Sequence, residues 1–401
     1  GLETGLYALL LLGLYAAARW YAEGRGRPAA LILALVSLLL FLTRPESIAL
    51  LALIAFMIVL LAVRHPGHYS LLPLLMGGVG ILLITAWRVA LFGDLLPNSV
   101  HAKSVLGFVL EDPQLLVPRA LAGMAYIRSF ALDSLLLVLL GLCGLWLYRR
   151  RFETAVAAAA LMTGLAVVLL NSGDWMPFAR LLTPLLPLLA LFSGLALQKI
   201  VALGSARTRQ HVYTGLATAT ALLVVTGFWM IRDRSLIEAR PWPQALCYRA
   251  AGLALEDRLS AGDVVAAEAL GEIGYVLPDT RFLDIFGLTE PFIAQHGTIP
   301  LATFTLGKHH YGYVMAQRPT LFLFHSPINN HIPFLVERGY QDYYDTFRIS
   351  DPDAECQLVV GLLRDEVPRL RPPLEERFIV EDIDARTVPP SAAATWPHGI
   401  R

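Results

Sequence analysis

Residues 154–170 read TAVAAAALMTGLAVVLL, a run that contains no ionisable side chain. A helix of about 20 mostly apolar residues, with a range of about 17–25, crosses the hydrocarbon core of a bilayer. Residues 134–148 and 212–231 likewise contain no side chain that is charged at neutral pH. A soluble helical core would show a polar stripe along each helix, and these runs show none. They therefore predict a polytopic α-helical membrane protein.

The apolar runs fill the chain from Gly1 to Ile231, and the remainder is patterned like a soluble protein. We expect about eight transmembrane helices, at residues 5–20, 29–43, 47–63, 70–92, 129–148, 154–171, 181–202 and 212–231. The expected domains are a transmembrane helical domain at 1–231, a small soluble α/β domain at 232–370 and a loose Pro-rich tail at 371–401.

The composition excludes several other classes of protein. Of 401 residues, 56% are hydrophobic and 16% are charged, and the 32 Lys and Arg residues balance the 32 Asp and Glu residues. A disordered chain would be less apolar, and an electrostatic nucleic-acid binder would need a basic surface. The three cysteines lack the spacing of zinc ligands. We therefore expect a lipid bilayer and not nucleic acid as the main partner, and we assign no metal ligand within the chain.

The cations of the interhelical connections indicate which side of the membrane each connection faces. With Gly1 outside, the inner connections would carry Arg19, Arg25, Arg27, Arg64, Arg149, Arg150, Arg151, Lys199, Arg207 and Arg209. The outer connections would carry the smaller set Arg44, Lys103, Arg119, Arg128 and Arg180. Because cytoplasmic connections are enriched in Lys and Arg, this bias predicts that Gly1 lies outside. Eight crossings would then place the α/β domain on the same, extracytoplasmic side.

The expected outer connections are chemically mixed, whereas the inner ones contain little besides cations, Gly and Pro. The outer ones read GLET at 1–4, TRPES at 43–47, GDLLPNSVHAK at 93–103 and SGDWMPFAR at 172–180. Polar groups at membrane depth are costly and commonly mark a functional path. Each residue alone also fits a simpler role, as a helix cap, a headgroup contact or an interfacial aromatic. Their convergence on one side favours a shared site on the outer face.

These stretches resemble the GT-C class of polytopic, lipid-sugar-dependent glycosyltransferases. Within that class they are most similar to the terminal β-1,2-arabinofuranosyltransferase-like proteins of bacterial cell-wall assembly. The resemblance rests on GLET at 1–4, TRPE at 43–46, GDLLPNSVHAK at 93–103, GDWMPFARLLTPLLP at 173–187 and EALGEIGYVLPDTRFLDIFGLTEP at 268–291. It covers most of the chain in order. The sequence departs from the family at Gly5, Ser47 and His101, where Pro, Gly and an aromatic residue are usual.

The resemblance implies an inverting glycosyltransferase of a bacterial inner membrane. It would move a sugar, with a pentose as one candidate, from a polyprenyl-phosphate donor to an extracytoplasmic cell-envelope glycan. Cations stabilise a phosphate leaving group, and the candidates for this role are Arg180, Lys103, Arg44 and Arg88. The candidates for binding the sugar or the acceptor are Asp174, Trp175, Glu46, Asn98, His101, Glu3, Glu268 and Asp284.

The catalytic Asp of this class lies in the first outer loop, which would precede Gly1. We therefore expect an earlier membrane segment and assign no catalytic residue within the chain. No Gly-rich nucleotide loop is present in the soluble part, which fits a lipid-linked donor. The need for a divalent cation stays open.

Helices alternate with strands after Arg232, which predicts a small α/β sheet domain. Strands are expected at 264–270, 281–286, 320–325, 345–349 and 357–363, and helices at 243–259, 291–295, 308–317 and 332–338. Glu268 and Asp284 lie near predicted strand ends, where α/β sheets bind ligands, although a role as surface charges fits them equally well. Cys247 and Cys356 could pair in an oxidising compartment, and the sequence leaves this open.

Two other classes of function are alternatives: a transporter or flippase for a lipid-linked or anionic solute, and a non-catalytic membrane binding protein. Transporters tend to carry ionisable residues near the middle of their helices and to contain internal repeats. The expected spans show neither feature, and their polar groups gather at one surface. This pattern favours chemistry at that surface, whereas a natural product that began at Gly1 would favour the non-catalytic role.

Overall fold

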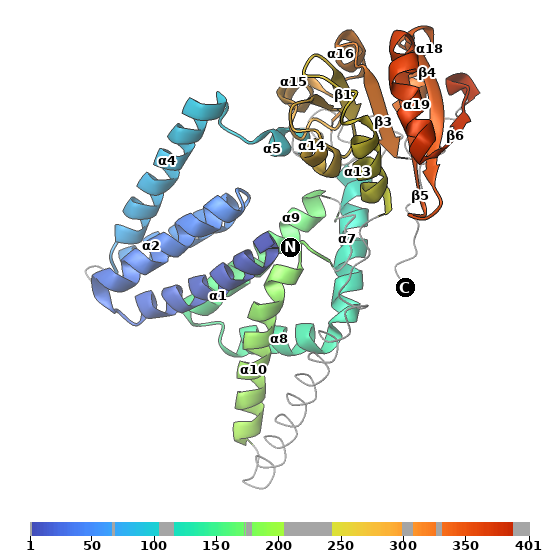
Figure 1. Ribbon diagram of the computed structural model, residues 1–401. Helices are drawn as coiled ribbons and strands as arrows, with labels where there is room; N and C mark the ends of the chain where they lie inside the picture. Colours follow the sequence, from blue (N-terminus) through green and yellow to red (C-terminus); the bar gives the residue numbers. More distant parts are fainter. Residues whose placement is uncertain are drawn as a thin grey trace. The chain divides into compact units, whose positions relative to one another are not determined.

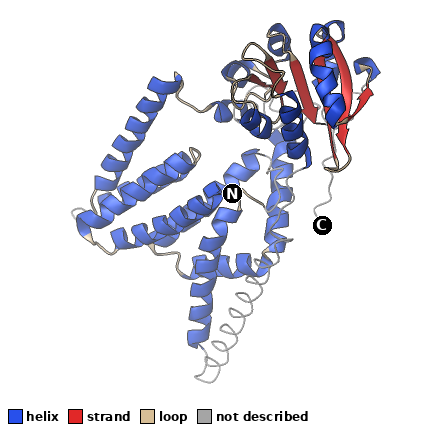
Figure 2. Ribbon diagram, in the orientation of Figure 1, coloured by secondary structure: helices blue, strands red, loops and turns tan. Residues whose placement is uncertain are grey.

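The computed structural model describes residues 2–65, 69–103, 116–171, 173, 179–203, 243–298, 308–325 and 331–387. The chain divides into two compact units, Gly1–Leu95 with Val105–Leu222, and Leu96–Ser104 with Leu223–Arg401. The first unit is helical, and the second holds the strands (Figure 2). The expected domain boundary at residue 231 lies outside the described residues.

The described helices of the first, helical unit follow one another in Figure 1 from blue to green. They are α1 (Leu2–Ala22), α2 (Gly26–Thr43), α3 (Ser47–Arg64), α4 (Leu72–Phe92), α7 (Leu116–Asp133), α8 (Leu135–Leu147), α9 (Phe152–Asn171), the 3₁₀ turn η2 (Thr183–Leu185) and α10 (Leu186–Leu203).

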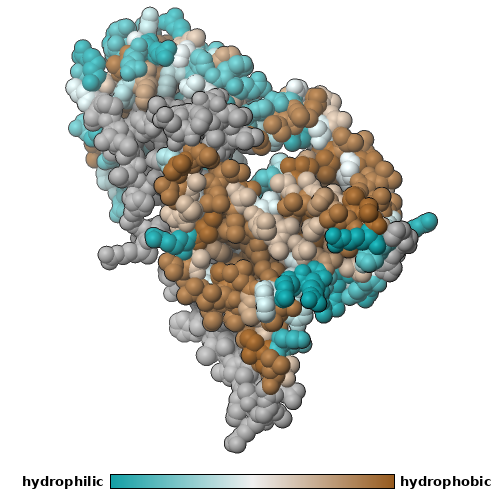
Figure 3. Space-filling view, turned by 180° about the vertical axis from the view of Figure 1, so that it is seen from behind, coloured by the Kyte–Doolittle hydropathy of each residue, from teal (hydrophilic) through white to brown (hydrophobic). Residues whose placement is uncertain are grey.

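Six helical spans within the described ranges are long and apolar enough to cross a membrane: α1, α2, α3, α4, α9 and the continuous η2–α10 segment. Their apolar side chains are widely exposed, as on α4, where Leu82 is 69% exposed. Figure 3 shows apolar residues spread over the surface of the helical unit and polar ones over much of the α/β unit. Such extensive apolar surface indicates a lipid environment.

The expected count of eight spans is not reproduced by the described residues. The run at 212–231 lies outside them. The span expected at 129–148 is not one continuous helix, because the chain bends by 95° between α7 and α8. Ser134 leaves the helical conformation there (φ −118°, ψ 25°). Counting the bent pair as one span gives seven. Helix α7 begins at Leu116. This is earlier than expected and lies within the connection predicted between the spans at 70–92 and 129–148.

Helices α7 and α8 each pack closely on a different partner helix, and a glycine lies at each close approach. A β-carbon on Gly144 of α8 would collide with the carbonyl of Phe192 on α10. On α7, a β-carbon on Gly123 would lie 2.8 Å from the Cα of Leu169 on α9. Small residues of this kind let membrane helices approach each other through their backbones.

The second unit is built on a six-stranded mixed sheet of order β2-β1-β3-β5-β4-β6. Its strands are β1 (Val264–Ala267), β2 (Arg281–Asp284), β3 (Leu321–His325), β4 (Tyr344–Asp351), β5 (Cys356–Leu363) and β6 (Ile379–Asp382). The first three strands run parallel, with Ala267 paired to Asp284 and to Leu323. The other three are antiparallel to their neighbours. The expected small α/β domain is therefore confirmed.

Helices cover both faces of this sheet because its strand residues alternate between two buried clusters. Val265 and Leu323 pack with one set of helices, and Ala266 and Phe324 pack with the other. The first set is α13 (Pro243–Leu255), α14 (Gly271–Val276) and α19 (Val367–Arg377). The second set is α15 (Pro291–His296), α16 (Tyr311–Ala316), α17 (His331–Val336) and α18 (Tyr340–Tyr343).

Two further features belong to the α/β unit. The short helix α5 (Asn98–Lys103), which lies far earlier in the sequence, packs against α15. A disulfide joins Cys247 on α13 to Cys356 at the start of β5, with a Cα–Cα distance of 6.0 Å. The pairing that the sequence left open is thus present.

The expected loose tail at 371–401 is wrong for residues 371–387, which form the end of α19, β6 and the turn η4 (Ala385–Thr387). The apolar spacing of Leu370, Leu374 and Phe378 explains the order, since all three are buried in the core below the sheet. Arg371 also pairs with Asp382 of β6 at 2.7 Å. Residues 388–401 lie outside the described part of the chain.

Candidate functional site

The first candidate cluster lies in the helical unit, where α2 ends and α3 begins. Arg44 is extended there (φ −143°, ψ 108°), as expected for a residue that precedes a proline, Pro45. Its Nε lies 2.9 Å from Oε1 of Glu3 in the first turn of α1. Its Nη1 lies 4.0 Å from Oε1 of Glu46. The fold thus brings together the stretches GLET and TRPE.

Tyr7 belongs to this cluster, although the sequence analysis did not single it out. Arg44 lies over its ring, 4.9 Å from the centroid, and its hydroxyl accepts a hydrogen bond from Ser47 Oγ at 3.2 Å. Tyr7 follows Glu3 by four residues, which places both on one face of α1. This spacing is the signal that could have found it.

Arg180 lies in a second turn of the helical unit. The residue before it, Ala179, has a positive φ of 47°, which is uncommon for a residue with a side chain. Its carbonyl accepts hydrogen bonds from the backbone amides of Leu182 and Thr183 at 2.8 and 2.9 Å. The backbone amide of Leu181 donates to the Tyr126 hydroxyl at 3.4 Å. These contacts fix the backbone from which the half-buried Arg180 side chain extends.

The remaining predicted residues lie in several places. Asp174 and Trp175 are outside the described residues. Arg88 is half-buried near the end of α4. Lys103 is the last residue of α5, and its side chain also falls outside the description. His101 is half-buried on α5. The predicted phosphate ligands are therefore divided between the two units, with Lys103 in the α/β unit and the three arginines in the helical unit.

In the α/β unit, Asp284 organises the loop after β2. Its buried carboxylate accepts the backbone amides of Phe286 and Thr289 at 2.9 and 2.7 Å, and the Thr289 hydroxyl at 3.1 Å. The carbonyl of Thr289 in turn accepts a hydrogen bond from Asn98 Nδ2 of α5 at 3.3 Å. Two predicted residues from separate stretches, Asp284 and Asn98, are thus connected through one loop.

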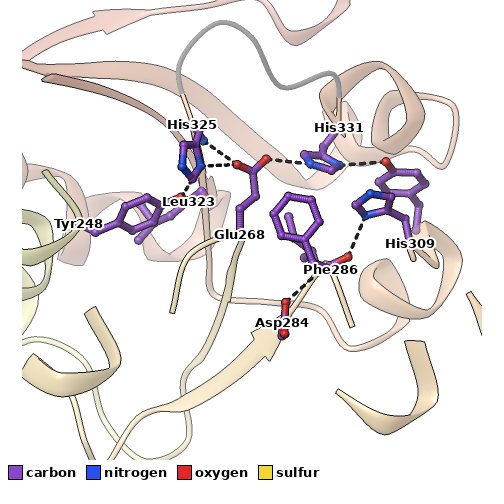
Figure 4. A network of polar contacts seen from close by, with 10 residues as sticks. Tyr248, Glu268, Asp284, Phe286, His309, Leu323, His325 and His331 are labelled. Atoms are coloured by element: carbon purple, nitrogen blue, oxygen red, sulfur yellow. Dashed lines mark hydrogen bonds and ion pairs between the residues drawn. The ribbon is translucent and has the colours of Figure 1, made fainter. Parts of the chain in front are cut away.

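Glu268 is the centre of a third cluster, shown in Figure 4 between two histidines. Its side chain is fully buried, and its Oε2 accepts the backbone amide of His325 at 3.0 Å and Nδ1 of the same residue at 2.5 Å. Its Oε1 lies 2.8 Å from Nε2 of His331. On the far side of that ring, Nδ1 lies 2.9 Å from the hydroxyl of Tyr311. His309 contacts the same group through its ring, 4.7 Å from the ring of His331.

The electrostatics of this cluster keep Glu268 ionised and His309 neutral. Burial raises the pKa of the Glu268 carboxyl, but positive charge at His331 and the hydrogen bonds from His325 and His331 outweigh burial and hold the pKa below its ordinary value. Burial lowers the pKa of His309 to about 3, and charge at His331 adds to this. Burial, reinforced by the Glu268 charge, raises the pKa of the Tyr311 hydroxyl. Perturbed groups of this kind are typical of functional sites.

The sequence analysis found Glu268 and missed His309, Tyr311, His325 and His331. A signal existed, since His325 ends a predicted strand and His331 precedes a predicted helix. His325 and His331 are engaged in the contacts with Glu268 described above, and Nδ1 of His309 lies 2.8 Å from the carbonyl oxygen of Ile285. Across the described ranges, no group of three or more His, Cys, Asp or Glu side chains could hold a metal ion.

Comparison with known proteins finds one family model that matches part of the chain. Residues 239–363 match a family model described as a domain of unknown function, DUF8728. This segment includes Glu268, Asp284, Tyr311 and both histidines that bind Glu268. No curated protein and no solved structure matches the chain.

Proposed function

We propose that the protein is a membrane glycosyltransferase that transfers a sugar from a polyprenyl-phosphate donor to a glycan outside the cytoplasm of a bacterium. Its apolar helices would hold the lipid donor at a bilayer. The polar residues at the ends of these helices would bind the phosphate of the donor. The α/β unit would bind the acceptor glycan.

The observation that carries this proposal is the contact between Glu3 and Arg44. These residues belong to two separate stretches of the glycosyltransferase-like pattern, and their side chains form a 2.9 Å ion pair. Arg44 is buried, and Glu46 and the Tyr7 ring complete its surroundings. Charged groups buried among apolar helices are costly, and they commonly mark a functional site. A headgroup site is the purpose that fits a lipid-linked substrate.

A second support comes from α5. The stretch that contains Asn98 belongs to the α/β unit, and only residues 93–97 separate it from α4. A segment this short, even when fully extended, cannot cross a hydrocarbon core of about 30 Å. The end of α4 and the α/β unit would therefore share one side of the membrane, as the cation bias predicts.

The disulfide between Cys247 and Cys356 supports an extracytoplasmic location for that side. Disulfides persist in oxidising compartments and are rare in the cytoplasm. An acceptor glycan of the cell envelope would be reached from the same side.

Within this proposal, the cations have different roles. Because Arg44 is already paired with Glu3, we assign it mainly to positioning the turn between α2 and α3. Arg180 extends from the fixed turn after Ala179, and we assign it to the donor phosphate, where a guanidinium can bind two oxygens at once. Lys103 and Arg88 would add positive charge, and Asp174 and Trp175 would contact the sugar.

The test is an activity assay on the protein expressed from its complete gene and reconstituted in lipid, with a panel of polyprenyl-phosphate sugars and a soluble glycan acceptor. We expect Arg180→Ala to abolish transfer with expression intact. Arg25→Ala removes an exposed cation paired with Glu23 and should leave transfer unchanged. Wild-type protein that transfers none of the sugars argues against the proposal, and full activity of Arg180→Ala argues against its phosphate role.

The location can be tested separately by thiol labelling in whole cells, in a Cys143→Ser background that removes the free cysteine. A cysteine in place of the exposed Glu355 of the α/β unit should react with a membrane-impermeant reagent. A cysteine in place of Arg25, between α1 and α2, should react only after the membrane is permeabilised. The opposite pattern would overturn the topology.

A further inference from the structure

The turn between α8 and α9 carries three consecutive arginines, Arg149, Arg150 and Arg151, and all three side chains are exposed. This basic turn lies beside the end of α1. The ring of Phe152, the first residue of α9, lies 6.1 Å from the ring of Tyr21 in the last turn of α1. The basic turn and the end of α1 therefore meet at one place in the helical unit.

This place lies one helix length from the ion pair between Glu3 and Arg44. Glu3 is in the first turn of α1, and Tyr21 is in its last turn. The 21 residues of α1 span about 30 Å at about 1.5 Å per residue, which is the thickness of a hydrocarbon core. The basic turn therefore lies at the opposite membrane boundary from that ion pair, and the proposed function gives it no role.

Aromatic rings hold two of the three guanidinium groups. Arg149 lies over the ring of Trp146, 4.5 Å from its centroid, and its Nη1 donates to the carbonyl oxygen of the same residue at 2.8 Å. Arg151 lies over the ring of Tyr148, 4.9 Å from its centroid. A cation is attracted to the face of an aromatic ring, and Trp and Tyr are enriched at the level of lipid headgroups. The rings therefore fix these cations at headgroup level.

Carboxylates near the turn leave part of this charge unbalanced. The buried Glu153 lies 3.8 Å from Arg151. At the end of α1, the carboxylate of Glu23 pairs with both Arg19 and Arg25, at 2.9 and 3.0 Å. Over residues 19–25 and 148–153, five arginines therefore face two carboxylates, and the excess charge is positive.

The side of α8 that leads to this turn is apolar and open. Leu139, Leu142 and Trp146 recur every three or four residues, so they share one face of the helix. Their exposed fractions are 57%, 53% and 62%. A ligand of this place therefore meets cations at the turn and apolar side chains along the helix.

An anionic phospholipid has both parts of this chemistry. A guanidinium offers several N–H donors in one plane, which match the oxygens of a phosphate. Arg150 makes no hydrogen bond, ion pair or ring contact with the other residues that the structure describes, so its donors face a ligand. A zwitterionic phospholipid would bring its own cation toward the arginines, and free phosphate would leave the apolar face of α8 unused.

We infer that the turn between α8 and α9 binds the headgroup of an anionic phospholipid, and that Arg150 contacts its phosphate. Trp146 and Tyr148 are positioning residues, because their rings hold the neighbouring arginines. The acyl chains lie along the exposed face of α8. This lipid is distinct from the sugar donor, and the inference does not depend on the proposed function.

The test is native mass spectrometry of the full chain in detergent, titrated separately with phosphatidylglycerol and phosphatidylcholine of identical acyl chains. We expect wild type to bind phosphatidylglycerol more tightly. Arg150→Gln should weaken phosphatidylglycerol binding about fivefold, the attraction of one arginine to anionic headgroups, and leave phosphatidylcholine binding unchanged. Equal affinities for the two lipids in wild type, or unchanged phosphatidylglycerol binding in Arg150→Gln, would overturn the inference.

Arg64→Gln is the matched control. Arg64 is exposed and ends α3, which begins three residues after Arg44 and therefore reaches the same boundary as the basic turn. This variant removes the same charge without touching the turn, so its affinity for phosphatidylglycerol should stay within about twofold of wild type. An equal loss in Arg64→Gln and Arg150→Gln would show a general response to positive charge and would reject a defined site.

Inorganic phosphate separates a lipid site from a site for a soluble anion. We expect inorganic phosphate, added in the same titration at the concentration of the lipid, to leave phosphatidylglycerol bound, because the apolar face of α8 contributes to lipid binding. Displacement of the lipid by inorganic phosphate would contradict the inference.

The positioning role of Trp146 has its own test. Trp146→Leu keeps the site apolar and removes the ring under Arg149, so it should weaken phosphatidylglycerol binding about twofold to fivefold. Trp146→Tyr restores an aromatic face and should recover most of that affinity. If both variants bind as weakly as each other, or if phosphatidylcholine binding falls equally, the ring serves packing and does not position Arg149.

Discussion

The Nε of Arg44 lies 2.9 Å from a carboxylate oxygen of Glu3, although 41 positions separate them in the chain. The two partners differ in environment, since the side chain of Arg44 is 8% exposed and that of Glu3 is 60% exposed. A buried guanidinium needs a counter-charge more than an exposed carboxylate does. The pair therefore joins the start of α1 to the turn between α2 and α3. It matters more for the buried Arg44 than for the exposed Glu3.

Replacing Glu3 should reveal this dependence. We expect Glu3→Gln to lower the stability of the helical unit by about 1–3 kcal/mol, because the buried Arg44 would lose its 2.9 Å counter-charge and keep the longer 4.0 Å contact with Glu46. The measurement is the thermal unfolding midpoint of the protein in detergent micelles. Glu23→Gln is the control, since Glu23 pairs with Arg19 and Arg25 at the surface and should cost less than about 1 kcal/mol. Equal losses in the two variants would show that burial of Arg44 is unimportant.

The close approach of α8 to α10 makes a second prediction. Gly144→Ala would force the new methyl group into the carbonyl of Phe192, so α8 must move away. We expect a loss of about 1–3 kcal/mol, as overpacking commonly causes. Gly78→Ala on α4 is the matched control, because a β-carbon there meets nothing within 4 Å. It should be neutral or slightly stabilising, since Ala is the better helix former. Thermal unfolding in the same detergent checks both, and a tolerated Gly144→Ala would contradict the packing.

The positions of most apolar helices were predictable, whereas the bend at Ser134 was not. Hydropathy records only whether a run avoids charge, and residues 129–148 satisfy that test on average. The helices on the two sides of the bend pack closely on different partners, α7 on α9 at Gly123 and α8 on α10 at Gly144. Such contacts depend on residues distant in sequence, so a single-sequence pattern does not contain them.

The disulfide supports a third prediction. Cys247 and Cys356 close a loop with a sequence separation of 109. Loops of this length reduce the entropy of the unfolded chain strongly, so we expect the double variant Cys247→Ser/Cys356→Ser to lose about 2–4 kcal/mol in the α/β unit. The urea midpoint followed by near-UV circular dichroism measures this loss. Cys143→Ser should leave the midpoint unchanged, because Cys143 is free. A midpoint insensitive to the double substitution would show that the bond does not stabilise the unit.

Only part of the candidate site was predictable from the sequence. The residues at strand ends were predictable, and those on the covering helices were not, for a physical reason. The sequence located Glu268 and Asp284 because strands of a parallel sheet end together at one edge. It missed His331 and Tyr311, which reach that edge from helices packed on one face of the sheet. Their contacts with Glu268 depend on how these helices lie on the strands, and local periodicity carries no information on that. The loose tail was wrong for the same reason, since burial of Leu374 and Phe378 depends on the sheet above them.

The ion pair between Asp263 and Arg369 gives the α/β unit a defined dependence on pH. Burial raises the pKa of Asp263, but hydrogen bonds from Arg369, 2.6 Å away, and from Ser260 outweigh burial and lower the pKa to about 2. The ordinary value is 3.8. Because the folded value is the lower one, the stabilisation is complete above about pH 4 and is lost as the pH falls toward 2. It amounts to about 1–2 kcal/mol.

We therefore expect the urea midpoint of wild type to fall between pH 5 and pH 2.5, and Asp263→Asn to show a lower midpoint at pH 5 and a smaller fall below it. Asp384→Asn tests specificity, because the pKa of Asp384 is also lowered, by hydrogen bonds from Arg386, but that pair is exposed. Solvent screens such a pair, so the pH profile of Asp384→Asn should follow wild type. If Asp263→Asn also follows wild type, the acid sensitivity of the unit arises elsewhere. If the fall of the midpoint at low pH is smaller in Asp263→Asn and unchanged in Asp384→Asn, the ion pair between Asp263 and Arg369 holds the residue before β1 against α19.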